Sequence, residues 1–200
     1  MPQTVSRTCY TFAELSDKAK DKAIEDARQS AAEFWEADHT LDDALEILAM
    51  LGFHVDNDGI SYSGFCSQGD GASFVGTWYP EDVKVGKVAE HAPEDADLAV
   101  IAREIERYVA ILDCEEDKGV AIVRRSGQYC HEMTVGFEFD WSEGIIEDTR
   151  KPFIEACRDL MRWIYRQLEA DYTWATSDDT IRENLTEGDT LYRENGRVDY

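Results

Sequence analysis

The stretch MTVGFEFDW, residues 133–141, alternates apolar and polar residues along its whole length. A period of two places the apolar side chains on one face of a β-strand and the polar side chains on the other. We therefore expect a half-buried strand here. Five other stretches also have strand character: residues 52–56, 60–65, 72–78, 119–125 and 128–131.

Short turns join these strands, which favours antiparallel pairing, because a parallel pair needs a long crossover. Apolar residues at helical spacing surround the strands and predict helices over residues 13–37, 40–51, 93–112 and 150–170, with a short one after residue 177. The fold class is therefore α+β, an antiparallel sheet of about four to six strands with helices packed around it. We expect a main domain over residues 1–170 and a small C-terminal appendage over residues 171–200.

The net charge is the strongest indication of function. The chain has 43 acidic and 20 basic residues among 200, a formal net charge of −23. Such a chain is repelled by nucleic acid and by anionic membranes, and it is attracted to basic clefts of proteins that bind nucleic acid. We expect a partner of that kind, no direct nucleic-acid binding and no membrane association.

The acids gather in residues 25–46, 94–117 and 132–148, where they outnumber the bases by 23 to 3. The cluster near residue 115 stands at an expected helix end, where carboxylates oppose the helix dipole at a cost of about 0.3–1 kcal/mol. A cluster kept at that cost indicates a use. The predicted partner-binding residues are Glu104, Glu106, Asp113, Glu115, Glu116, Asp117, Glu138, Asp140 and Glu143.

A glycine-rich loop is the most unusual local sequence. Its central residues are Ser67, Gln68, Gly69, Asp70 and Gly71. The glycines allow positive φ, and we expect Gly69 or Gly71 to adopt it. Open backbone N–H groups could hold an anion there, but no lysine follows and no helix begins, so the loop is not a phosphate-binding P-loop. A tight hairpin loop, satisfied by its own side chains, is the structural interpretation.

Four stretches resemble a family of uncharacterised phage and prophage proteins. They are residues 10–20, residues 64–74 (GFCSQGDGASF, similar to F-x-S-Q-G-D-G-A-x-F), residues 129–133 and residues 163–172. The resemblance implies a phage-encoded accessory protein and no particular reaction.

Candidate chemistry is sparse. Cys66, Cys130 and His131 would form a metal or Cys–His site if they met across a sheet, and Asp70 with Glu132 or Glu138 would form a carboxylate pair. The four histidines lack metal-ligand spacing. We therefore expect no catalytic residue, no metal and no cofactor. Trp35, Trp174 and Tyr200 stand beside acids and would anchor an interface if exposed.

Three functions fit these observations. The first is a phage-encoded, non-enzymatic inhibitor of a host defence complex, of the CRISPR-effector or restriction-enzyme type, whose acidic face occupies a nucleic-acid groove and mimics DNA. The second is a phage hydrolase, acting on a nucleotide or through a metal, that uses the Gly69-Asp70-Gly71 loop. The third is an acidic structural protein of a salt-adapted host or phage.

The cellular compartment follows from the cysteines and the hydropathy. Five widely spaced cysteines without a C-x-x-C pair indicate reduced thiols. No apolar run approaches the roughly 20 residues of a membrane span, and the first residues lack a signal-peptide pattern. We expect the cytoplasm of the host cell.

Overall fold

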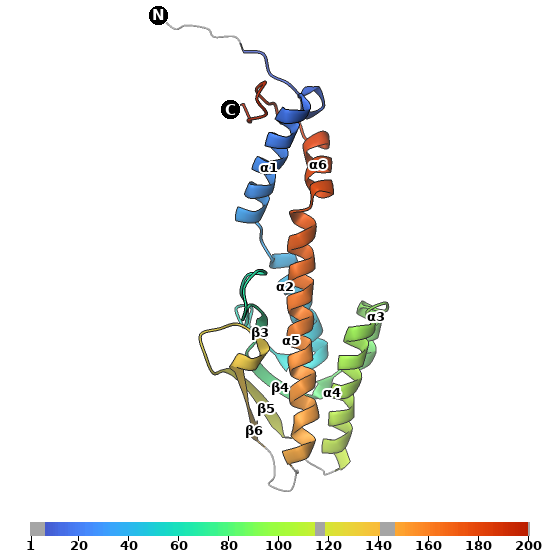
Figure 1. Ribbon diagram of the computed structural model, residues 1–200. Helices are drawn as coiled ribbons and strands as arrows, with labels where there is room; N and C mark the ends of the chain where they lie inside the picture. The colour runs from blue at the N-terminus through green and yellow to red at the C-terminus, as the bar shows by residue number, and fades with distance from the viewer. Residues whose placement is uncertain (1–6, 115–118, 141–146, 200) are drawn as a thin grey trace, which may run out of the picture. The chain divides into compact units, whose positions relative to one another are not determined.

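The computed structural model describes residues 7–114, 119–140 and 147–199 (Figure 1). The chain divides into two compact units. Unit 1 combines residues 1–37 with residues 170–200, and unit 2 consists of residues 38–169. This division differs from the expected one, because the first helix groups with the C-terminal segment instead of with the rest of the chain. The boundary near residue 170 falls inside a continuous helix.

Unit 2 has a mixed order of helices and strands. Its elements are α2 (Asp38–Met50), β1 (Leu51–His54), β2 (Ile60–Tyr62), β3 (Ala72–Phe74), β4 (Gly76–Val83), α3 (Val85–His91), α4 (Ala96–Cys114), β5 (Val120–Arg125), η2 (Glu132–Thr134), β6 (Val135–Asp140) and most of α5 (Glu147–Ala175). Strands β1, β4, β5 and β6 form an antiparallel sheet in that order, and β2 and β3 form a separate antiparallel pair. The predicted α+β class is confirmed.

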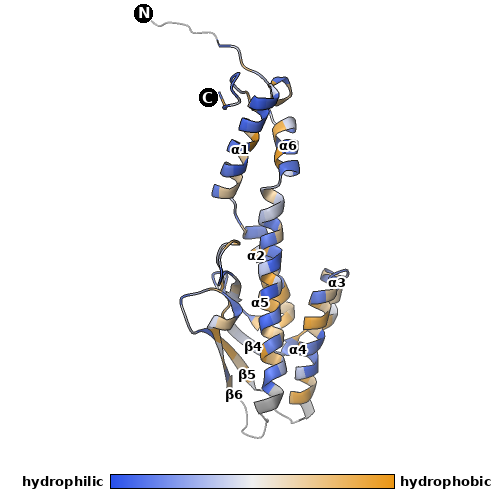
Figure 2. Ribbon diagram, in the orientation of Figure 1, coloured by the Kyte–Doolittle hydropathy of each residue, from blue (hydrophilic) through white to orange (hydrophobic). Residues whose placement is uncertain are grey.

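Strand β6 lies within the alternating stretch of residues 133–141, where a half-buried strand was predicted. It pairs with β5 from Val120 opposite Asp140 to Arg125 opposite Val135. One face of this sheet is covered by α4 and α5 (Figure 1). Figure 2 shows hydrophobic residues along β4 and β5 and a mixture of hydrophobic and hydrophilic residues along α5, as expected of a helix with one buried side.

Aromatic rings fill the space between the sheet and these helices. Phe153 of α5 lies 4.5 Å from Trp78 of β4 and 4.6 Å from Tyr108 of α4, measured between ring centroids. Trp78 stands opposite Ala121, which stands opposite Phe139, so these residues share the covered face. Burying each large ring stabilises the fold by roughly 1.5–3 kcal/mol.

The pairing of β1 with β4 contains a bulge that explains two residues unusual in strands. Leu51 stands opposite Val83, whereas Phe53 stands opposite Trp78, so the register shifts across Gly52. Pro80 lies in the bulged part of β4, where the missing N–H breaks no ladder bond. Gly52 has φ +83°, and a Cβ there would lie 2.6 Å from the Tyr79 carbonyl oxygen. It belongs to β1, which begins directly after α2 ends at Met50.

Two strand predictions were wrong. Residues 72–78 form two strands of different sheets, because Val75 donates its N–H to Gly59 instead of continuing the ladder. Residues 128–131 form no strand, and Met133 lies in η2, so β5 pairs with β6 itself. The short helix α3 was not predicted. The helix expected over residues 150–170 is longer at both ends.

Side-chain caps fix several helix starts. The Asp95 carboxylate accepts the Leu98 N–H at 2.8 Å and so begins α4. Its second oxygen accepts the Trp163 indole N–H of α5 at 2.7 Å. One residue therefore caps one helix and ties it to another.

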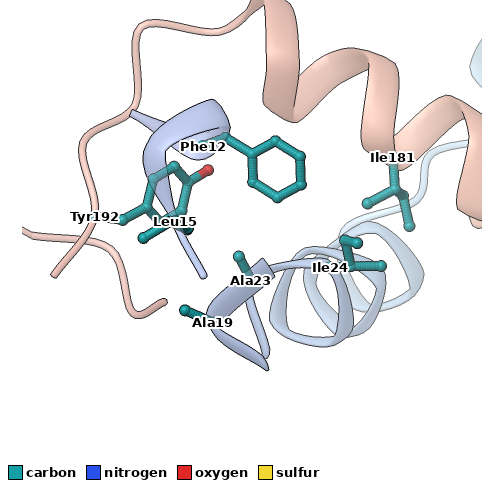
Figure 3. Packing of buried hydrophobic residues seen from close by; sticks show 7 residues of the cluster. All are labelled: Phe12, Leu15, Ala19, Ala23, Ile24, Ile181 and Tyr192. Carbon is teal, nitrogen blue, oxygen red and sulfur yellow. The ribbon is translucent and has the colours of Figure 1, made fainter. Parts of the chain in front are cut away.

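Unit 1 has a small core of its own. It contains η1 (Phe12–Glu14), α1 (Asp17–Glu33), the last turns of α5, and α6 (Asp178–Glu187), which begins after Ser177 as predicted. Figure 3 shows Phe12, Leu15, Ala19, Ala23, Ile24, Ile181 and Tyr192 packed together. Backbone hydrogen bonds between Tyr10 and Tyr192 join the two ends of the chain.

Candidate functional site

The glycine-rich loop is closed by its own backbone and side chains. Ser63 donates its N–H to the Gly71 carbonyl at 3.0 Å, which extends the β2–β3 pair. One carboxylate oxygen of Asp70 accepts the N–H groups of Cys66, at 3.0 Å, and Ser67, at 2.6 Å. Asp70 therefore satisfies the turn, as the structural interpretation of the loop predicted.

The two central glycines are required for different reasons. Gly69 has φ +95°, which confirms the expected left-handed conformation, and the space around its missing Cβ is open. Gly71 does not have positive φ. Instead, a Cβ on Gly71 would lie 2.5 Å from Cβ of His131. The sequence alone could not predict this contact between residues 60 positions apart.

The segment that touches Gly71 is also internally bonded. His131 Nδ1 accepts the Met133 N–H at 3.1 Å, and the Thr134 hydroxyl donates to the carbonyls of Tyr129 and His131. Arg162 of α5 donates to the Glu132 carboxylate at 2.9 Å. Cys130 and His131 lie before η2 and not in a strand.

Helix α5 completes this region. The Tyr165 hydroxyl donates to the Gly64 carbonyl at 3.0 Å, and its ring lies 5.6 Å from the ring of Phe65. Burial raises the pKa of Tyr165, and the negative charges of Glu169 and Asp70 raise it further. Residues 63–71, residues 129–134 and the Arg162–Tyr165 turn of α5 thus form one surface, here called the motif platform.

The motif platform brings together three of the four stretches that resemble the phage proteins. Its surface exposes Tyr129 and Met133, whose side chains are 60% and 55% accessible. The three carboxylates considered for chemistry are each held by another group: Asp70 by the loop backbone, Glu132 by Arg162 and Glu138 by Arg124 at 2.9 Å. Among the described residues, no three His, Cys, Asp or Glu side chains are arranged to hold a metal ion.

The predicted partner-binding residues whose side chains the structure describes lie on two different faces. Helix α4, which carries Glu104 and Glu106, covers one face of the sheet through Tyr108. Glu138 alternates with the covered Phe139 and so points to the opposite face, where Asp140 also lies. Glu104 pairs with Arg107 at 3.9 Å. Asp113 lies in the last turn of α4, and Glu115, Glu116, Asp117 and Glu143 lie outside the described residues.

A different array of carboxylates lies on α2. Asp38, Asp42, Asp43 and Glu46 are all exposed, while Ala44, Ile47 and Leu48 face the core. We call these four acids the acidic row. Asp38, Asp42 and Glu46 follow each other at intervals of four, which puts them on one face about 6 Å apart. The row lies within the acid-rich segment 25–46, although its residues were not among the predicted site residues.

The acidic row is poorly neutralised. No lysine or arginine of the described residues forms an ion pair with it. Among the described residues, His91 of α3 contacts it, with Nε2 at 2.6 Å from Asp43 and Nδ1 at 4.0 Å from Glu46. The hydrogen bond to Asp43 raises the pKa of His91, and the charges of Asp43 and Glu46 act in the same direction, against a smaller opposing effect of burial.

Comparison with known proteins gives one finding. No curated protein and no solved structure matches the chain. In the part of the chain that the structure describes, no helix is both long enough and apolar enough to cross a membrane. One family model, described as a domain of unknown function (DUF8835), matches residues 34–178. This range takes in all of unit 2 and well over half of the chain, so the protein belongs to the DUF8835 family.

Proposed function

We propose that this protein is a non-catalytic binding protein that docks its anionic surface on the basic, nucleic-acid-binding surface of a partner protein. The observation that carries the proposal is the acidic row, four exposed carboxylates on α2 that the described lysines and arginines leave without an ion pair. Repulsion along this row destabilises the free protein. A cationic partner removes that repulsion.

The spacing of the row also suits such a partner. Three of its carboxylates repeat at about 6 Å along one helix face, a spacing similar to that of consecutive phosphates on a DNA strand. A groove lined with arginine and lysine for nucleic acid would meet a comparable line of charge on this helix. Electrostatic steering by the net charge of −23 would speed association at low salt.

The motif platform supports binding over catalysis. A hydrolase working through Asp70 would need that carboxylate to act on a substrate or a metal. Asp70 instead accepts two backbone N–H groups of its own loop. The segment that carries the exposed Tyr129 and Met133 is hydrogen-bonded internally, which suits a surface that contacts another protein.

The resemblance to phage proteins supplies a setting for this activity. A phage-encoded protein of this kind would block a host defence complex, such as a CRISPR effector or a restriction enzyme, by occupying its nucleic-acid groove. The protein would act inside the host cell and would not contact DNA itself.

The test is capture of host proteins on the immobilised full-length chain, followed by elution with duplex DNA. We expect nucleic-acid-binding proteins to be retained and then released by DNA. Replacing two acids of the row, Asp42→Lys with Glu46→Lys, should abolish their retention. The matched control is Glu183→Lys with Glu187→Lys, which makes the same charge change at the same spacing on the exposed face of α6.

Two results would contradict the proposal. In the first, the row variant and the α6 variant retain the same proteins in the same amounts. In the second, the isolated protein shifts duplex DNA in a gel at physiological salt, which a nucleic-acid mimic would not do.

A further inference from the structure

The end of α1 and the end of α5 present two aromatic side chains to solvent in unit 1. The Phe34 side chain is 74% accessible and that of Trp174 is 65% accessible. Neither ring packs against another aromatic ring of the described residues. Large apolar side chains that stay exposed next to each other mark interaction sites more often than isolated ones do.

Trp35 links the end of α1, which carries Phe34, to the last turns of α5, which carry Trp174. Its indole N–H donates to the Asp171 carboxylate at 3.2 Å, and its ring meets Tyr172 edge to face at 5.4 Å. Phe34 is its neighbour in sequence and ends α1 by donating its N–H to Ser30. Trp174 follows Asp171 by three residues on α5, so the two side chains share a helix face. Phe34, Trp35 and Trp174 are here called the aromatic patch.

Carboxylates border the patch. Glu33 and Glu36 flank Phe34 and Trp35 in the sequence, and both are exposed. Neither forms an ion pair with a described lysine or arginine. A second copy of this chain would bring the same carboxylates against each other, which costs free energy. Charge complementarity therefore selects a cationic occupant.

The chemistry of the patch selects among cations. The face of an aromatic ring attracts a guanidinium group by its quadrupole, and the planar guanidinium also stacks on the ring and can bond a carboxylate with two parallel N–H groups. Lysine, a compact and strongly hydrated charge, gains less from a ring at the surface.

The matched range of the family model begins at Phe34 and ends at residue 178, so it includes the patch and excludes most of the rest of unit 1.

We infer that the aromatic patch is a second docking surface, which receives an arginine-rich segment of the partner protein. This inference rests on the proposed function, because it assumes a cationic partner. It adds a preference for arginine over lysine that the acidic row alone does not give.

Calorimetric titration of the full-length protein with a nona-arginine peptide and a nona-lysine peptide tests the inference. We expect the arginine peptide to bind the unmodified protein about fivefold more tightly than the lysine peptide. Trp174→Ala and Phe34→Ala should each reduce the arginine affinity by about fivefold and remove the preference. The control is Leu191→Ala, which removes another exposed apolar side chain of unit 1 and should leave both affinities unchanged.

The outcomes separate this inference from the proposed function. If the patch variants bind both peptides as the unmodified protein does, while Asp42→Lys with Glu46→Lys weakens both, the patch is overturned and the proposed function stands. If the patch variants lose arginine binding but the row variant still captures the same host proteins, the role of the row is overturned and the patch stands. A dimer in sedimentation that Trp174→Ala dissociates would assign the patch to self-association and overturn the inference.

Discussion

The motif platform and the acidic row use their charged residues in opposite ways. In the platform, Asp70 and Glu132 are bonded to the backbone of the loop and to Arg162, so their charge stabilises the fold. In the row, Asp42 and its neighbours face solvent, and of the residues that the structure describes only His91 partly compensates them. The carboxylates of the motif platform, which has the most unusual sequence, therefore stabilise the fold. The carboxylates of the acidic row, on a helix without any unusual motif, are left largely uncompensated.

The largest expected effect is at Gly71, where the platform is most tightly packed. Gly71→Val would push a side chain into the backbone and Cβ of His131, since even a Cβ alone approaches to 2.5 Å. We expect a loss of about 3 kcal/mol in the free energy of unfolding, as overpacked sites show, measured by urea denaturation. Gly69→Ala, which meets only backbone strain, should cost about 1 kcal/mol. Equal losses at the two glycines would refute the packing explanation.

Asp70→Asn tests whether the platform is structural. The amide keeps an acceptor oxygen but loses the charge, so each hydrogen bond to the loop weakens. We expect the free energy of unfolding to fall by about 1 kcal/mol, with partner capture unchanged. A folded variant that keeps its melting temperature and loses its activity would favour the hydrolase that the proposed function rejects.

The acidic row should respond in the other direction. Asp42→Lys replaces two like-charge neighbours at intervals of four by two opposite-charge pairs, with Asp38 and Glu46. We expect the free energy of unfolding to rise by about 0.5–1 kcal/mol, with a higher melting temperature and weaker partner binding. If the free energy of unfolding of Asp42→Lys falls instead, repulsion along the row does not destabilise the free protein, and a partner would gain nothing by removing it.

The smallest effect concerns the pH dependence of the contact between His91 and Asp43. Because the pKa of His91 is raised in the folded state, the stabilisation from its charge is complete below the unfolded pKa of about 6.5 and is lost as the pH rises through the higher folded value. The stability difference between the unmodified protein and His91→Gln should therefore shrink from about pH 6 to about pH 8. A constant difference would contradict the contact.

Local patterns in the sequence predicted much of the fold. Residues 133–141 alternate, so most of β6 could be placed, and Ser177 marks the start of α6. Helix α3 was missed because it has only seven residues, among them Gly86 and the exposed Lys87. Strand β4 was cut short because Pro80 is compatible with it only through the bulge that Gly52 allows.

The site was harder to predict than the fold, because it depends on contacts between distant residues. The glycine pattern predicted the conformation of Gly69. The reason for Gly71 is its contact with His131, which lies in the segment between β5 and η2. Acid-rich segments could be read from the sequence. The sequence did not reveal which acids share a face of the molecule. Glu138 and the acids of α4 are separated by the sheet that α4 packs against.

The salt dependence of the association rate with a captured partner tests the central claim most directly. For the unmodified protein, the rate constant should fall steeply as salt rises from low to physiological concentration, because the acidic row steers the encounter. For Asp42→Lys with Glu46→Lys it should be lower at low salt and nearly flat, whereas the α6 control should keep most of the slope. Identical rates for all three proteins across this range would contradict binding through the row.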